Sequence, residues 1–194
     1  MRARDNPFAV ERVHAVRYRP LGETLEQILT RLDRMNYRGA IVGPEGSGKT
    51  TLLEDLQSAL EARGFSTRMI FVNDAHPFDG TTCRRLLSEL PSDEIVLFDG
   101  ADAISPSCWR LLRHRTIQHA RGLIVTTHRR GRFPTLIDCQ TTPQLLQEIV
   151  ADLLPRDQAI SPDLLTRLFA EHKGNLRDCL RHLYDLLATD ALPA

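Results

Sequence analysis

Residues 43–50 read Gly-Pro-Glu-Gly-Ser-Gly-Lys-Thr and form the pattern with the clearest chemistry in the chain. They match G-x-x-x-x-G-K-[ST], in which glycines let successive backbone N–H groups point at phosphate oxygens. Lys49 would reach the β- and γ-phosphates of a nucleotide, and the Thr50 hydroxyl would take a Mg²⁺ position. The expected nucleotide-binding residues of this phosphate loop are Gly43, Pro44, Glu45, Gly46, Ser47, Gly48, Lys49, Thr50 and Thr51.

The composition makes an accidental match to the phosphate loop rare. The chain has 194 residues and balances 25 Lys plus Arg against 25 Asp plus Glu, yet only Lys49 and Lys173 are lysines. With so few lysines, the motif arises by chance in roughly one per thousand chains of this composition. The zero net charge also argues against a general polyanion-binding protein.

A second acidic element follows the phosphate loop. Residues 94–99, Glu-Ile-Val-Leu-Phe-Asp, form an apolar run that ends in a carboxylate. An Asp at the carboxyl end of such a strand lies beside the phosphate loop, where it can hold Mg²⁺ through water. We therefore expect Thr50 and Asp99 to form a Mg²⁺ site.

Short apolar runs and amphipathic stretches alternate around these motifs. Strands are expected at residues 40–42, 69–72, 95–98, 123–126 and 136–139, with helices between them. This alternation predicts an α/β fold, a three-layer P-loop NTPase core with a parallel sheet of about five strands.

The strand signals stop near residue 142. Helix starts at Thr142-Pro143, Ser161-Pro162 and Asn175 predict a small C-terminal helical lid. The expected organisation is an irregular N-terminal segment at 1–22, a nucleotide-binding core at 23–141 and the lid at 142–194.

Several segments resemble AAA+ ATPases, which belong with the STAND ATPases to the ASCE division. Residues 97–104, Leu-Phe-Asp-Gly-Ala-Asp-Ala-Ile, resemble the family's strand-end segment, usually apolar residues followed by Asp-Glu-Ala-Asp-Ala. Residues 123–129 are similar to the sensor-1 strand, and residues 174–178 to the Gly-Asn-x-Arg sensor-2 motif of the lid. The resemblance implies that ATP is the nucleotide, that Thr127 or His128 lies near the γ-phosphate, and that Arg177 senses the nucleotide.

One position departs from the family's pattern. Gly100 stands where the family has a catalytic Glu directly after the Walker B Asp, here Asp99. General-base help is typically worth ~10²–10⁴-fold, so the glycine predicts slow hydrolysis with nucleotide binding retained. Asp102 either replaces the missing carboxylate or is a turn or helix-capping residue, so the candidate catalytic residues are Asp99, Asp102, Thr127 and His128.

An arginine-rich segment without acidic residues follows Asp102. We define this arginine tract as residues 110–132, with Arg110, Arg113, Arg115, Arg121, Arg129, Arg130 and Arg132. Three interpretations are open: a solvated face, an oligomer contact that supplies an arginine finger, or a contact to the phosphate backbone of nucleic acid.

The cysteines, the remaining histidines and the apolar runs are those expected of a cytoplasmic protein and indicate no further metal site. Cys83, Cys108, Cys139 and Cys179 contain no C-x-x-C pair, which fits reduced thiols. The histidines outside the arginine tract show no metal-ligand spacing. Apolar runs are too short to span a bilayer and no secretion signal precedes the first helix.

These observations favour an ATP-binding protein that couples Mg²⁺·ATP to conformational change or to assembly with itself or a protein partner. The enzyme interpretation is an ATPase with a weakened Walker B element. The first alternative is a non-hydrolysing regulatory or interaction module, in which ATP is a ligand only. The second alternative is a P-loop small-molecule kinase, which the sensor-like Arg177 fits less well.

Overall fold

The computed structural model of the protein describes residues 5–73 and 78–189. It divides into two compact units. The core unit contains residues 19–43 and 49–139, and the helical unit contains residues 1–18, 44–48 and 140–194. Within the described residues, we find no helix with the length and apolar character that crossing a bilayer requires.

The core unit is built on one five-stranded sheet. Its strands are β1 (Arg38–Val42), β2 (Ser66–Phe71), β3 (Glu94–Asp99), β4 (Gly122–Thr127) and β5 (Thr135–Asp138). They lie in the order β2-β3-β4-β1-β5, and every neighbouring pair is parallel. The predicted sheet is therefore confirmed in strand number, strand direction and approximate strand positions.

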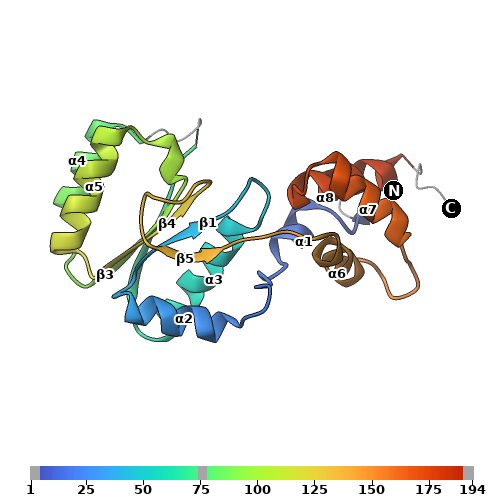
Figure 1. Cartoon of the computed structure of the whole chain (residues 1–194), viewed down its shortest axis with the longest axis horizontal. Coiled ribbons are helices and arrows are strands. Elements are labelled where there is room, and N and C mark those ends of the chain that lie inside the picture. Colours follow the sequence, from blue (N-terminus) through green and yellow to red (C-terminus); the bar gives the residue numbers. More distant parts are fainter. Residues whose placement is uncertain (1–4, 74–77, 190–194) are drawn as a thin grey trace. The chain divides into compact units, whose positions relative to one another are not determined.

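Helices cover both faces of this sheet (Figure 1). One face packs against α4 (Gly80–Ser88) and α5 (Pro106–His119), where the strand residues Val96 and Phe98 share an apolar cluster with helix residues. The other face carries α2 (Leu25–Arg34) and α3 (Lys49–Ala62). Because β3 and β4 are covered on both faces, their sequences are continuous apolar runs rather than alternating ones.

Side-chain caps mark most of the helix starts, including two of the three starts predicted for the lid. Thr24 forms a capping box at the start of α2, and the hydroxyls of Ser105 and Thr142 accept backbone N–H bonds at the starts of α5 and α6. Asn175 caps α8 in the same way. Ser161 precedes α7 without a side-chain cap bond, so its proline neighbour alone marks that start.

The helical unit contains α1 (Val10–His14), α6 (Pro143–Leu153), α7 (Pro162–Glu171) and α8 (Leu176–Ala188). The segment expected to be irregular, 1–22, thus contains a short helix. Phe8, which precedes it, is buried in one apolar cluster with Leu146 and Leu183. The Asn6 side chain is buried and donates to the backbone carbonyl of Tyr184 at 3.0 Å. This bond attaches residue 6 to α8.

Candidate nucleotide-binding site

The phosphate loop joins β1 to α3, and its backbone depends on two glycines. Gly46 and Gly48 have φ angles of +69° and +83°, which L side chains adopt at a cost. The Ser47 hydroxyl donates to the Pro44 carbonyl at 2.8 Å and closes the turn. Within the helical unit, a Cβ at Gly46 would lie 1.8 Å from the Asn175 side-chain oxygen, so glycine is required there for space as well.

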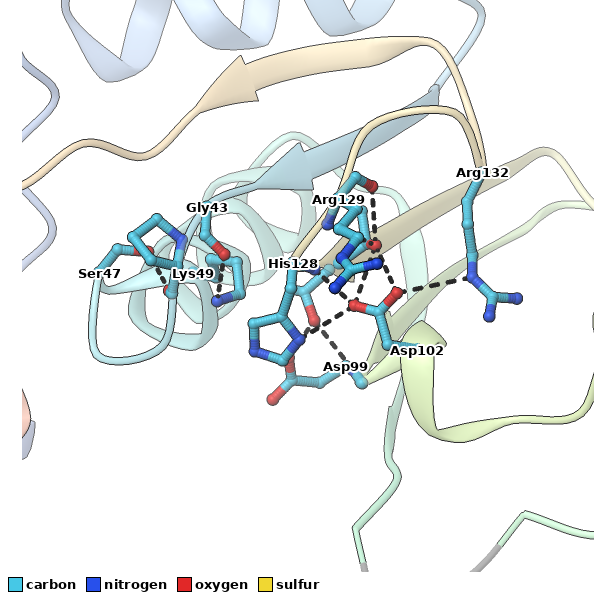
Figure 2. Close-up of polar contacts among 12 residues, drawn as sticks. Gly43, Ser47, Lys49, Asp99, Asp102, His128, Arg129 and Arg132 are labelled. Carbon is cyan, nitrogen blue, oxygen red and sulfur yellow. Dashed lines mark hydrogen bonds and ion pairs between the residues drawn. The ribbon is translucent and has the colours of Figure 1, made fainter. Parts of the chain in front are cut away.

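Lys49 and Thr50 lie in the first turn of α3, at the positive end of the helix dipole. The Lys49 ammonium donates to the Gly43 carbonyl at 2.9 Å, as Figure 2 shows. Its charge is thus held within the core unit at the carboxyl end of β1. This arrangement supplies the positive potential that an anionic ligand needs.

Asp99 connects the phosphate loop to two neighbouring strands. One carboxylate oxygen accepts from the Thr50 hydroxyl at 2.9 Å, and the other accepts from the Thr126 hydroxyl at 2.5 Å. The Thr126 oxygen also accepts the backbone N–H of Gly100 at 2.8 Å. The orientation of the Asp99 carboxylate is therefore set by β4 and α3 together.

Asp102 lies in a 3-10 turn after β3 and is the centre of a second polar network (Figure 2). Its carboxylate accepts from the Thr127 hydroxyl at 2.9 and 3.0 Å and from the His128 backbone N–H at 2.5 Å. The His128 ring nitrogen Nδ1 and the Arg132 guanidinium lie 3.1 and 3.6 Å from it. Partial burial alone would raise the pKa of this carboxyl, but the bonds from His128 and Thr127 and the nearby positive groups outweigh it and lower the pKa.

The backbone at position 100 requires glycine. Its φ angle is +90°, in the left-handed region that favours glycine. A Cβ there would lie 2.4 Å from the Val72 carbonyl oxygen. Any residue other than glycine would have to move the carboxyl end of β2 or of β3, so this chain's turn excludes a side chain at the position.

The structure brings four predicted residues together at the carboxyl edge of the sheet: Asp99, Asp102, Thr127 and His128. It adds Thr126, which the sequence did not indicate and which holds Asp99, and it places Arg132 of the arginine tract against Asp102. The adjacent threonines at 126 and 127 give a sequence signal, but either hydroxyl could have faced Asp99. Arg177 is exposed in the first turn of α8, and its contact with a nucleotide stays a prediction.

Several arginines of the arginine tract pack on aromatic rings of the core unit. Arg113 lies 5.7 Å from the centre of the Phe133 ring, and Arg132 lies 5.6 Å from that of Trp109. Arg121 stacks over Tyr37 and Phe65, and Arg130 pairs with Asp138. Among the residues that the structure describes, no ring contact or ion pair is recorded for three exposed members: Arg110, Arg115 and Arg129.

Comparison with known proteins gives structural neighbours only. No protein-family model and no curated protein matches the sequence. RuvB of Thermotoga maritima, described as a Holliday junction branch migration motor, superposes with a TM-score of 0.57 at 18% identity, over 86% of this chain and 63% of that chain. A lysine-to-arginine mutant of the same RuvB gives a TM-score of 0.59 at 18% identity, over 87% and 64%.

A second kind of neighbour is NtrX of Brucella abortus, whose structure is a complex with ATP. It superposes with a TM-score of 0.53 at 16% identity, over 95% of this chain and 56% of that chain. The chain thus spans less than two thirds of the length of these neighbours. At such identities the likeness establishes the fold alone: the protein has the α/β fold of these P-loop NTPase neighbours, with the parallel five-stranded sheet that the sequence predicts.

Proposed function

We propose that this protein binds Mg²⁺·ATP and couples binding to conformational change or assembly, with hydrolysis that is slow or stimulated by a partner. The observation that carries the proposal is the 2.9 Å hydrogen bond from the Thr50 hydroxyl to Asp99, across 49 residues of sequence. It joins the phosphate loop to the Walker B carboxylate. If the glycine-rich turn matched the motif by accident, nothing would require Thr50 to pair with Asp99. The ATP in the NtrX structure further supports ATP as the nucleotide.

The side chains at this point suit Mg²⁺. Thr50 and Asp99 offer a hydroxyl and a carboxylate, the oxygen ligands that hard divalent cations prefer. In this proposal Thr50 and Asp99 would hold the ion, and Lys49 would exchange its bond to Gly43 for bonds to phosphate oxygens. The ion would neutralise charge on the β- and γ-phosphates.

The rate of hydrolysis depends in this proposal on Asp102. Gly100 offers no proton acceptor, and the lowered pKa of Asp102 makes that carboxylate a weak one. Its hydrogen bonds to Thr127 and His128 hold the end of β4, where the sensor-1 resemblance expects the γ-phosphate. In this proposal Asp102 orients the attacking water through its hydrogen-bond network. Hydrolysis is slow because the carboxylate is a weak proton acceptor.

Steady-state phosphate release separates an ATPase from a non-hydrolysing module. We expect the wild-type chain to release phosphate slowly from Mg²⁺·ATP and Asp102→Asn to reduce turnover about 100-fold, the low end of a general-base contribution. The matched control is Asp93→Asn, an exposed aspartate just before β3 that should keep wild-type turnover. Thermal unfolding of each variant checks the fold.

Two results of this assay would favour other conclusions. Equal turnover in Asp102→Asn and the wild type would remove Asp102 from the reaction. ATP binding without any phosphate release above background would support the non-hydrolysing regulatory module, for which Gly100 is the specific observation.

Assembly is tested by the mass of the chain in solution. The exposed members Arg110, Arg115 and Arg129 leave positive charge available to a partner, and an arginine finger would stabilise transition-state charge on a neighbouring nucleotide. We expect light scattering to show a larger species with Mg²⁺ and a slowly hydrolysed ATP analogue than without them. Arg129→Ala should abolish this increase, whereas Arg34→Ala, on α2, should not. An unchanged monomer mass would exclude the self-assembly part of the proposal.

A further inference from the structure

We propose that the helical unit carries a site for a transition-metal ion, with Zn²⁺ as the fitting ion, formed by Glu171, His172 and His182. These residues lie where α7 ends and midway along α8. One potential ligand atom from each side chain lies within 4.8 Å of the other two. The inference does not depend on nucleotide binding, since all three residues belong to the helical unit.

The two imidazoles carry the argument. Nε2 of His172 lies 2.9 Å from Nδ1 of His182, and the ring planes are inclined by 82°. Two nitrogens bonded to one tetrahedral Zn²⁺ at ~2.0–2.1 Å lie about 3.3 Å apart. The observed separation is within a few tenths of an ångström of that value, so the two nitrogens are close enough to share one ion after a turn of the rings.

The third ligand is an acidic side chain in an unfavourable place. Glu171 is the last residue of α7, where the negative end of the helix dipole disfavours a carboxylate. Among the described residues, no ion pair is recorded for it, and the side chain is exposed. A divalent cation at the histidine pair would compensate the charge of the Glu171 carboxylate and the negative end of the helix dipole. Because the Glu171 side chain is exposed, it is free to change rotamer and reach the ion.

The surroundings favour a cation. A pocket of about 510 Å³ adjoins the histidines and is lined by two more carboxylates, Asp178 and Asp185, against one guanidinium, Arg181. Asp178 is engaged by the Asn175 amide at 2.7 Å. Neither aspartate belongs to the group of ligand atoms that lie within 4.8 Å of one another, which leaves water for the fourth position of a tetrahedral site.

The two helices hold these ligands without needing a metal to fold. The connection between them is fixed by bonds from Asn175 N–H to the His172 carbonyl at 3.0 Å and from the Thr141 hydroxyl to the Gly174 carbonyl at 2.9 Å. Cys179 of α8 is buried and donates its thiol to the Leu168 carbonyl of α7. Burial raises the pKa of that thiol to about 11, so Cys179 remains a packing residue and not a ligand.

The ligand chemistry selects the class of ion. Two imidazole nitrogens and one carboxylate suit Zn²⁺ and similar transition metals, whereas Mg²⁺ and Ca²⁺ prefer oxygen atoms alone. Zn²⁺ would join the end of α7 to α8 and so stabilise the helical unit. This site differs in ligands and in metal from the oxygen site at Thr50 and Asp99.

The test is calorimetric titration of the full nucleotide-free chain with Zn²⁺, in excess Mg²⁺ so that sites made of oxygen atoms are occupied. We expect one Zn²⁺ per chain and a rise in Tm of about 5 °C at saturation. His182→Ala should weaken binding at least ~100-fold, since even outer-shell changes cost ~10–100-fold. The control is His114→Ala, an exposed histidine of α5, which should bind Zn²⁺ as the wild type does.

Two results would overturn the site. One is a wild-type chain that takes up no Zn²⁺, in which case the histidines form a hydrogen-bonded pair only. The other is unchanged affinity in His182→Ala. Should that variant lose helical circular dichroism, Glu171→Gln decides instead, because its exposed side chain is not needed for folding: about tenfold weaker binding supports the site, and wild-type affinity overturns it.

Discussion

Replacing Lys49 with alanine is expected to lower the affinity for Mg²⁺·ATP by about 10- to 100-fold, as measured by titration calorimetry. The physical reason is the loss of a charge-assisted hydrogen bond to phosphate, worth ~1.5–3 kcal/mol. In the structure the ammonium lies 2.9 Å from the Gly43 carbonyl. Gly43 is buried, so its carbonyl loses one hydrogen-bond partner in the variant, and we expect Tm to fall by a few degrees only.

The sequence provides a matched control for this experiment. Lys173 is the only other lysine and is exposed in the connection between α7 and α8. Lys173→Gln removes the same charge without touching the phosphate loop, so its ATP affinity should equal that of the wild type. If Lys49→Ala bound ATP as tightly as the wild type, the proposed nucleotide site would be wrong.

Placing a glutamate at position 100, as in the AAA+ pattern that this segment resembles, is expected to destabilise the protein rather than to accelerate hydrolysis. Gly100→Glu should lower the free energy of unfolding by about 2–4 kcal/mol, through left-handed strain and through displacement of the Val72 carbonyl. Gly100→Ala should cost nearly the same, since the Cβ and not the carboxylate makes the contact. Urea denaturation measures both variants, and phosphate release should stay at or below the wild-type rate.

A second glycine separates the two causes. Gly64 has a φ angle of +83° but open space where a Cβ would be, so Gly64→Ala should cost only the strain, about 1 kcal/mol. A larger loss at position 100 than at position 64 isolates the steric contact with Val72. A Gly100→Glu variant with wild-type stability and faster turnover would contradict our account of this turn.

The α/β core could be predicted from sequence because its patterns are strong and local. The central strands are buried on both faces and therefore appear as short continuous apolar runs between helical stripes. Capping residues such as Thr24 and Thr142 mark helix starts locally, because each hydroxyl accepts from the backbone N–H three residues further along the chain. The phosphate loop adds a motif whose residue types and spacing follow directly from the requirements of phosphate binding.

The parts that could not be predicted depend on contacts between distant residues. The helix α1 has five residues, too few for a periodic pattern, and the burial of Phe8 arises from α6 and α8. The spacing of His172 and His182 matches no familiar metal motif, and only the pairing of α7 with α8 brings their rings together. For the same reason, the sequence could not show which threonine holds Asp99.

The arginine tract shows why charge counted along a chain is a poor guide to charge on a surface. Arg113 lies over Phe133, the Phe133 ring meets Trp109 at 5.9 Å, and Trp109 lies under Arg132. These four side chains form a row in which the two rings meet edge to face, at 78°, between the two guanidinium groups, and the row links α5 to the loop after β4. Arg132 in turn contacts Asp102. If a partner displaced α5, the loop that holds Asp102 would therefore have to move with the helix, or the three ring contacts between helix and loop would have to break.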